Sequence, residues 1–415
     1  MKIGKYSFGL GDRFAHQGVA QLKALVKAKE LGYHFIPVWN KSNREHTFIH
    51  SVPAQTRAEA DAAVKALGWK DPYFCDADHI NMSNVDKFID VCDFFTLDVA
   101  DYIGKADAAG EIAGFIEANK KYMGKLSIPG ISHPFDITEA LLKQIAEKFL
   151  FAVQEAATIY KHIVSVKGEG HFVPEVSMDE VNDAQSPVEM FFILRAIAMH
   201  GIPAQTIAPK FTGRFNKGVD YVGDIKKFAQ EFEEDLLVID FAIKEFGLPE
   251  NLKLSVHSGS DKFAIYPVMG DLIKKYNKGI HIKTAGTTWC EEMIGLSMAG
   301  GDALALVKDI YKEACSSREE MTKPYATVID INPSRLPSPE EVDKWDGIKL
   351  AETLRHVQSN KNYNPDFRQL IHVGFKLAAN RGDAYLNLLK KHAGVIGEQV
   401  TTNILERHIK NLFRL

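Results

Sequence analysis

The sequence predicts a closed TIM-type (β/α)8 barrel followed by a mostly helical C-terminal extension. Short β-like runs alternate with longer helical stretches, which is the pattern of a parallel sheet. Eight such units fit into about 290 residues, close to the size of a TIM barrel with insertions. A doubly wound open sheet is less favoured, because no GxGxxG motif follows the first strand.

The expected strands are short apolar runs, each followed by polar residues. In chain order they are Tyr6–Gly9, His34–Val38, Tyr73–Cys75, Phe94–Leu97, Phe172–Ser177, Gln205–Pro209, Lys253–Val256 and Ile280–Lys283.

Helical spacing and capping residues place helices between these strands. Residues 20–31 carry apolar side chains at helical spacing. A helix over 56–67 is expected to begin at Thr56, because Glu59 lies three residues further on and completes a capping-box pattern.

Later helices have their own start and stop signals. A long helix over 138–164 follows a Gly/Pro-rich stretch that ends in the candidate N-cap Asp136. Ser186 followed by Pro187 starts the next helix. The helix over 224–246 closes at a glycine.

From about residue 290 onward the chain is rich in helix formers, with one β-like run at 326–331. We therefore predict a catalytic barrel domain over 1–290 and a helical extension over 291–415 that packs on the barrel.

Composition excludes several classes of function. The net charge of −4 argues against nucleic-acid binding. No apolar run approaches the roughly 18 residues of a membrane helix, so we expect no membrane insertion. The four cysteines are far apart and form no CxxC pair, which indicates reduced thiols in a cytoplasmic protein. The sequence leaves open whether the protein forms a homo-oligomer.

Polar side chains just past each strand end converge on one mouth of such a barrel. The residues in this position are Asp12, Arg13, Asn40, Lys41, Asp76, Asp78, His79, Asp98, Asp101, Glu175, Asp179, Glu180, Lys210, Arg214, Lys217, Asp220, His257, Ser258, Asp261, Lys262, Lys283 and Thr284.

Two of these residues, His79 and His257, are the metal-ligand candidates. Two imidazoles with a carboxylate, and open positions for substrate oxygens, suit a catalytic divalent ion such as Zn, Mn, Co or Ni. A single histidine at a strand end is more often structural. Two that face one barrel mouth beside several acids make a shared ion the better hypothesis.

Two carboxylates are candidates for acid–base work. Inversion at an sp3 carbon needs one group to remove a proton and another, on the opposite face, to deliver one. Asp78 and Glu175 are expected in these roles. Asp76 is the main rival of Asp78, because strand alternation sends both to the same side.

Cationic and hydroxyl side chains near the last two strands suggest an anion site. Ser258 begins a Ser-Gly-Ser turn after the seventh strand, where barrels often bind phosphate. Lys262, Lys283 and Arg13 are equally suited to hold a substrate carboxylate.

These residues lie in motifs that resemble the D-tagaturonate epimerase family. The motifs are SFGLGDR, DADH, PEVSMDE, KGVDY, HSGSDKF and HIKTAGT at successive strand ends, and QLIHV near residue 370. The resemblance implies a metal-dependent enzyme that interconverts tagaturonate and fructuronate, with related enzymes acting on free tagatose.

The resemblance also assigns roles to residues. It implies that Asp78 accepts a proton, that Glu175 donates one, and that His79 and His257 bind the metal. A third metal ligand is expected in the loop after the sixth strand, where GVDY matches and points to Asp220.

The implied reaction inverts a hydroxyl-bearing carbon β to the ketone, whose proton no adjacent carbonyl acidifies. A retro-aldol path therefore explains the inversion better than enolisation, and direct removal of the carbon-bound proton is the rival. Two other functions stay open. One is a different metal-dependent ketose enzyme, either an isomerase or a class II-like aldolase, and the other is a non-catalytic sugar-binding protein.

Overall fold

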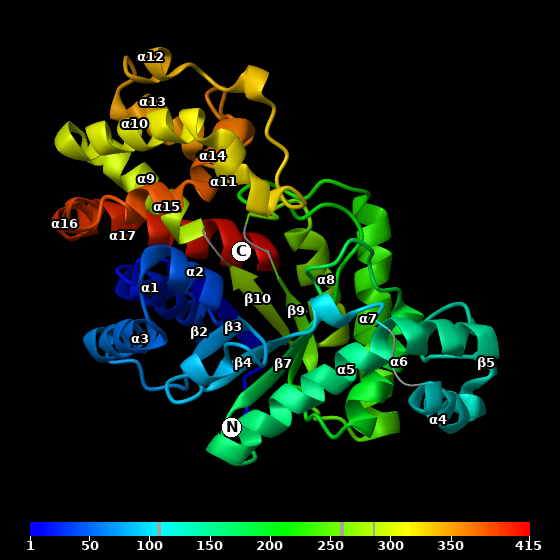
Figure 1. Ribbon diagram of the computed structural model, residues 1–415. Coiled ribbons are helices and arrows are strands. Elements are labelled where there is room, and N and C mark those ends of the chain that lie inside the picture. Colours follow the sequence, from blue (N-terminus) through cyan, green and yellow to red (C-terminus); the bar gives the residue numbers. More distant parts are fainter. Residues whose placement is uncertain (106–108, 258–260, 285–286) are drawn as a thin grey trace.

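The computed structural model describes residues 1–105, 109–257, 261–284 and 287–415. Within them, eight parallel strands close into a barrel in the order β1-β10-β9-β8-β7-β4-β3-β2 (Figure 1). The barrel strands are β1 (Tyr6–Gly11), β2 (Phe35–Ser42), β3 (Phe74–Ile80), β4 (Phe94–Asp98), β7 (Val173–Ser177), β8 (Thr206–Ala208), β9 (Lys253–Val256) and β10 (Ile280–Thr284). The predicted fold class and its eight strands are confirmed.

The barrel interior changes from apolar to polar along its axis. A separate apolar cluster fills one level, formed by Ile3, Ile36, Val38, Phe74, Phe94 and Val173. Toward the C-terminal ends of the strands, Asn40 pairs in register with Asp76, and Thr96 with Glu175. The interior therefore has an apolar layer followed by a charged layer. The charged layer lies nearer the C-terminal ends of the strands, where active sites of this fold are found.

Helices cover the outside of the barrel. Those that follow the first seven strands are α1 (Gly18–Glu30), α2 (Asn43–Ile49), α3 (Pro53–Leu67), α4 (Ala109–Asn119), α5 (Glu139–Lys167), α6 (Pro187–Met199), α7 (Ile225–Phe246) and α8 (Tyr266–Tyr276).

The remaining chain is helical, as expected. Its main elements are α9 (Thr287–Ala299), α10 (Gly301–Ser316), α11 (Arg318–Thr322), the 3₁₀ turn η4 (Lys323–Tyr325), α12 (Pro339–Val342), α13 (Gly347–Leu354), α14 (Pro365–Val373), α15 (Phe375–Ala379), α16 (Asp383–Lys391), α17 (Ala393–Thr402), the π-helical η6 (Asn403–Ile409) and α18 (Lys410–Phe413). Helices α10–α14 lie beyond the end of the barrel toward which β9 and β10 point (Figure 1).

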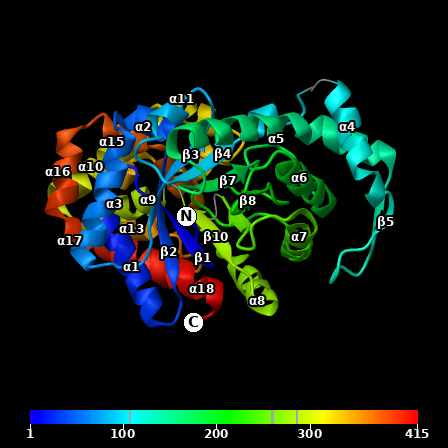
Figure 2. The same cartoon turned by 90° about the horizontal axis from the view of Figure 1, so that it is seen from below.

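The last helices complete the ring around the barrel. Helix α9 leaves the barrel and packs on α13 and α17. In its place η6 contacts α1 and α18 contacts α8, so the end of the chain fills the gap between α8 and α1 (Figure 2). Because α9 also runs across residue 290, the division at that residue stays a proposal.

Three local predictions were wrong. Helix α3 begins at Pro53, and Glu59 accepts a hydrogen bond from Gly18 N–H at 3.0 Å, so it does not form a capping box with Thr56. Asp136 does not cap α5. Thr138 does, because its side chain accepts the Leu141 N–H, while Asp136 lies in the short hairpin β5 (Gly124–Leu126)–β6 (Phe135–Ile137).

The third concerns the β-like run at 326–331, which forms a turn and irregular chain. Its polar backbone groups bond to other elements: Val328 O accepts from Lys217 N–H, and Asp330 N–H donates to the Gln369 side chain. The hairpin β5–β6 was missed because its two strands have only three residues each. Within the described residues, no helix is both long and apolar enough to cross a membrane.

Candidate active site

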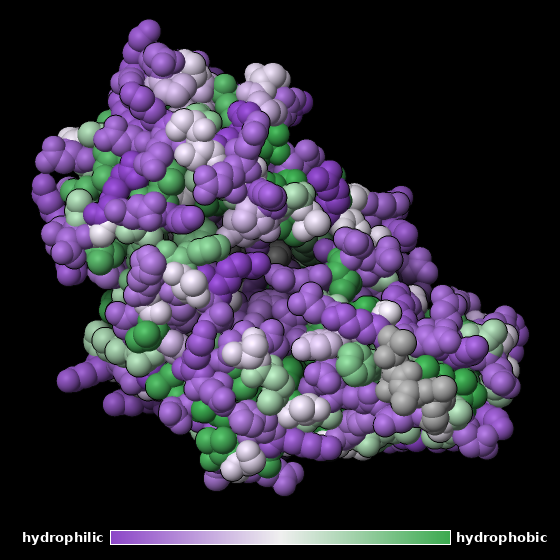
Figure 3. Space-filling model, viewed as in Figure 1, coloured by the Kyte–Doolittle hydropathy of each residue, from purple (hydrophilic) through white to green (hydrophobic). Residues whose placement is uncertain are grey.

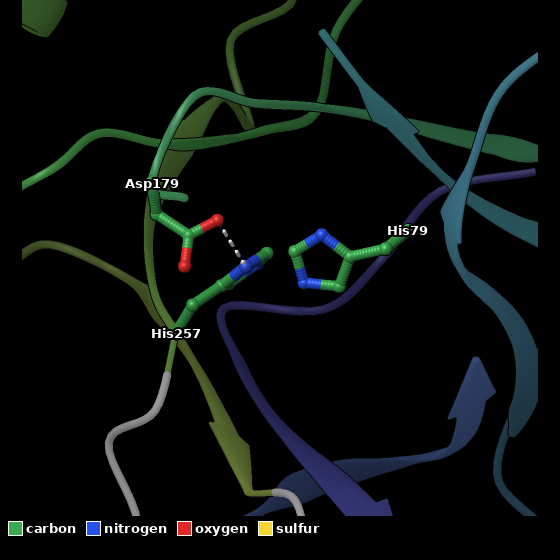
Figure 4. A group of neighbouring side chains, drawn as sticks. All are labelled: His79, Asp179 and His257. Carbon is green, nitrogen blue, oxygen red and sulfur yellow. Dashed lines mark hydrogen bonds and ion pairs between the residues drawn. The ribbon is translucent and has the colours of Figure 1, made fainter. Parts of the chain in front are cut away.

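A bulge in β3 sets the direction of His79. The register between β3 and β4 shifts between Ala77 and Ile80. His79 has φ of 51°, in the left-handed region that non-glycine residues seldom adopt. Simple alternation would place His79 on the opposite face from Asp78, but its ring instead faces His257 (Figure 4). Bulges beside active sites often redirect a side chain in this way.

The two imidazoles meet across the barrel mouth. Their ring centroids are 5.1 Å apart, in an edge-to-face arrangement. Asp179, just past the end of β7, joins them, and one ligand atom from each of the three residues lies within 4.8 Å of the others (Figure 4). Two nitrogens and one carboxylate oxygen form the ligand set of many catalytic divalent-metal sites.

Outer carboxylates orient both imidazoles. His79 Nδ1 lies 3.0 Å from Asp98 Oδ2. His257 Nε2 lies 2.8 Å from Glu175 Oε1, and its Nδ1 lies 3.1 Å from Asp179 Oδ1. Histidine ligands usually hydrogen-bond to a carboxylate through the nitrogen that does not face the metal, which fixes the ring and its tautomer. Glu175 is placed to hold the ring of His257 in this way, and Asp98 is placed to hold the ring of His79.

The surroundings of the two imidazoles are strongly acidic. Burial favours their neutral form, but nearby carboxylates outweigh it. Asp179 and Glu175 raise the pKa of His257 to about 9. Asp78 and Asp98 raise the pKa of His79 well above its ordinary value. The mouth thus carries an excess of negative charge that a cation would balance.

Lys283 is surrounded by carboxylates in the layer below. Its Nζ lies 2.6 Å from Asp76, 2.7 Å from Asp78 and 3.3 Å from Glu175, and it donates to Thr96 Oγ1 at 2.6 Å. Gly9 makes room for it, because a Cβ at Gly9 would lie 2.9 Å from Lys283 Cγ.

The two neighbouring aspartates differ in their acidity. Although burial opposes ionisation, Lys283 and His79 lower the pKa of Asp78 to about 2. Burial dominates at Asp76 and raises its pKa to about 7, in spite of Lys283. Asp78 is therefore the stronger acid of the two, and its side chain is also the one that reaches the cavity.

Two adjoining cavities open at this mouth, and Figure 3 shows the hydrophilic hollow between the C-terminal helices and the barrel. The inner cavity is lined by Arg13, Asn40, Ser42, Arg44, Glu45, Asp78, His79, Asp179, Glu180, Lys217, His257, Lys283 and Tyr325. The side cavity, of about 280 Å³, shares six of these residues and extends along the loop from Pro209 to Lys217 and the segment from Pro324 to Val328.

The donor set fits a divalent cation. The three candidate ligands supply nitrogen and oxygen atoms at one place, and both cavities reach His257 and Asp179. Glu175 Oε2, beside His257, is buried without a hydrogen-bond partner among the described residues. His79 forms a second possible group with Asp98 and Glu180.

Asp220, the expected third ligand, does not join the imidazoles. Its carboxylate accepts hydrogen bonds from the Tyr221 and Ala264 backbone N–H groups at 2.7 and 3.0 Å, and from Gln358 Nε2 at 2.9 Å. These bonds tie the loop after β8 to the loop after β9 and to the C-terminal region. The carboxylate that lies beside the two imidazoles is that of Asp179.

The residues predicted to bind a substrate carboxylate have different surroundings in the structure. Lys262 is fully buried, donates to the Asn216 and Val219 carbonyls, both at 2.8 Å, and lines neither cavity. Arg13 and Lys283 do line the inner cavity, but Arg13 pairs with Glu45 at 3.0 Å, and Lys283 is held by acids. Ser258 lies outside the described residues.

Sequence reasoning missed several cavity residues. Asp179 and Glu180 were recognised as strand-end acids but were passed over in favour of Glu175, which does not line either cavity. Arg44 and Tyr325 gave no signal, since Arg44 lies six residues beyond the end of the expected second strand and Tyr325 lies far from all of the expected barrel strands. Lys217 lay within the KGVDY motif, where only the aspartate was chosen.

Comparison with known proteins gives one family. A model of the UxaE tagaturonate epimerase family matches residues 1–412. The tagaturonate/fructuronate epimerase of Thermotoga maritima is 26% identical over 419 aligned positions, which cover 97% of this chain and 80% of that protein.

Solved structures with the same fold come from Cohnella laeviribosi. Fructuronate-tagaturonate epimerase UxaE with one glycerol superposes with a TM-score of 0.82 at 23% identity, covering 99% of this chain and 82% of that one. The native crystal form gives 0.81 at 22% identity, with the same coverage. These likenesses support the barrel and its C-terminal helices.

Proposed function

The chain belongs to the tagaturonate epimerase family, and on this premise we propose that it interconverts D-tagaturonate and D-fructuronate, using a divalent cation held by His79, Asp179 and His257. The observation that carries the metal proposal is the meeting of two imidazoles and a carboxylate at one barrel mouth. Zn, Mn, Co and Ni are the candidate ions.

The cation would act as a Lewis acid on the ketone and its neighbouring hydroxyl. The chain supplies the remaining chemistry. Asp78 lines the inner cavity and is ionised at neutral pH, because its pKa is about 2. It is therefore suited to accept the proton of the hydroxyl on the β-carbon.

Loss of that proton allows the bond between the α- and β-carbons to break. The β-carbon becomes an aldehyde, and the bonding electrons form an enediolate with the former ketone. The aldehyde turns over, the enediolate carbon attacks its other face, and the new alkoxide takes up a proton. No carbon-bound hydrogen is exchanged in this sequence.

Glu175 takes part through its neighbours. It does not line either cavity, but Lys283 contacts both Asp78, at 2.7 Å, and Glu175, at 3.3 Å. We therefore assign Lys283 to deliver the proton to the new alkoxide, with Glu175 holding Lys283 and His257 in place. The proton on Asp78 returns to Lys283 through their direct contact, which completes the cycle.

The test begins with the metal-stripped protein. Tagaturonate, fructuronate, tagatose and fructose are offered before and after reconstitution with each ion, and bound metal is measured by mass spectrometry. We expect one ion bound per chain and epimer formation from the uronates only after reconstitution. Full activity of the stripped protein would contradict the metal proposal, and no uronate turnover with any ion would contradict the proposed function.

The route is tested by running the reaction in deuterated water. The retro-aldol path leaves no carbon-bound deuterium at the inverted centre. Incorporation of deuterium there would establish direct deprotonation of the carbon.

A further inference from the structure

Lys217 lies where the barrel meets the C-terminal region. It belongs to the loop after β8, and its backbone N–H donates to Val328 O at 2.8 Å. It lines the inner and the side cavity, as do Arg44, at the start of α2, and Tyr325, at the end of η4. The ring of Tyr325 lies 5.7 Å from Lys217 Nζ and 5.8 Å from Arg44 Cζ.

The charge of Lys217 lacks a close counterion. Within the described part of the chain, no carboxylate oxygen lies within 4.0 Å of its ammonium, whereas Arg13 pairs with Glu45 at 3.0 Å and Arg214 with Asp330 at 3.1 Å. The nearby Arg44 has only a long contact, 3.6 Å, with Glu180. Burial and Arg44 together lower the pKa of Lys217. A half-buried ammonium beside a guanidinium is stabilised by a bound anion.

Two other lysines near the mouth, Lys262 and Lys283, already have partners. The ammonium of Lys262 donates hydrogen bonds to two backbone carbonyls, and that of Lys283 pairs with three carboxylates. Because His257, Asp179 and Lys217 line both cavities, a ligand with its ketone end at the imidazoles can place its far end toward Lys217.

We propose that Lys217, assisted by Arg44, binds the carboxylate of the substrate and so selects keto-uronates over neutral ketohexoses. This assignment rests on the proposed function. It makes Lys217 a specificity-determining residue contributed by a loop that the C-terminal region holds in place.

The test compares Lys217→Met with the wild type on tagaturonate and on tagatose. A hydrogen bond to a charged group is worth about 1.5–3 kcal/mol, so kcat/KM for tagaturonate is expected to fall roughly 10- to 100-fold, mainly through KM. The value for tagatose is expected to change less than about threefold. Lys217→Arg is expected to retain most of the uronate activity, and Lys226→Met, on an exposed part of α7, serves as the matched control.

Binding provides a measurement independent of turnover. In metal-loaded Asp78→Asn protein, the additional Lys217→Met substitution is expected to weaken binding of tagaturonate by a similar factor in calorimetry. An unchanged Kd, or an equal loss of kcat/KM on both sugars, would overturn the assignment. Failure of the wild type to turn over any uronate would instead overturn the proposed function, which keeps the two outcomes apart.

Discussion

Two buried clusters of histidines and carboxylates among the described residues differ in charge balance and access. The barrel-mouth cluster (His79, His257, Asp179, with Asp78, Glu175 and Lys283) lines cavities, and its three carboxylates outnumber its single lysine. The Arg368 cluster (Asp261, Arg368, His356 and His408) joins the loop after β9 to the C-terminal helices. The side chains of Asp261, Arg368 and His356 are 0% exposed, and that of His408 is 1% exposed.

The same residue types behave oppositely in the two clusters. Carboxylates raise the pKa of the imidazoles at the barrel mouth. In the Arg368 cluster, burial lowers the pKa of His356 and His408, because Arg368 already pairs with Asp261. Arg368 also donates to the Gly218 and Leu354 carbonyls at 2.6 and 2.7 Å. Histidine and aspartate together therefore indicate a reactive site only where their charges are left unbalanced beside a cavity.

Removing an imidazole from the barrel mouth is expected to have the largest effect. His79→Ala or His257→Ala should lower kcat/KM roughly 10⁴-fold, or about 5 kcal/mol, because the cation loses a ligand. Urea unfolding of the metal-free variants is measured alongside, because removing His257 also takes a partner from the buried Glu175 and Asp179 and should lower the midpoint. His171→Ala, on an exposed loop, is the control. If both variants kept the bound metal and the activity, the barrel-mouth cluster would not be the metal site, and the contrast with the Arg368 cluster would fail.

Breaking the Arg368 cluster should affect stability first. Arg368→Met leaves the carboxylate of Asp261 buried without its counterion, so the free energy of unfolding should fall by about 3–5 kcal/mol. Urea denaturation measures this. The Asp261→Asn/Arg368→Met double variant should recover part of the lost free energy of unfolding. If the two single losses in free energy simply added in the double variant, the pairing argument would be refuted.

A weaker effect is expected from the carboxylate behind His79. Asp98→Asn keeps the size of the side chain but weakens the hydrogen bond to Nδ1, so metal affinity should fall about 10- to 100-fold. Competition with a chelator measures the affinity. Asp101→Asn, exposed three residues further on, should leave it unchanged, and equal effects of the two variants would contradict an orienting role for Asp98.

The smallest effect concerns a buried carboxyl that forms no ion pair within the described part of the chain. Burial and Asp12 raise the pKa of Glu292, on α9, from 4.5 to about 8, while Tyr385 and Gln17 hydrogen-bond to it. The folded state therefore binds more protons than the unfolded state between these values. The stability that this group contributes is full below pH 4.5 and is lost as the pH rises through 8.

Glu292→Gln should remove that dependence. Between pH 6.5 and pH 8 the wild type should lose about 1–2 kcal/mol more unfolding free energy than the variant, measured by urea denaturation at each pH. Glu147→Gln, at a largely exposed position on α5, should leave the slope unchanged. A variant with the slope of the wild type would show that Glu292 is ionised in the folded protein.

The sequence predicted the architecture better than the site. Eight strands could be located because each is an apolar run that ends at polar residues, and His79 and His257 stood out at two of those ends. The position of Asp179 depends on the path of the loop after β7, which no periodicity encodes. Lys262 was chosen because it follows the seventh strand, whereas its ammonium donates to the carbonyls of Asn216 and Val219, in a loop whose path no sequence pattern indicated.

The contact of η6 and α18 with α1 and α8 has a consequence for biosynthesis. All eight barrel strands have been translated by residue 284, but residues 403–413, which seal the gap, emerge roughly 130 residues later. At typical translation speeds this interval lasts on the order of 10 s. During that time the apolar surface that η6 and α18 cover in the folded chain is expected to be exposed to solvent.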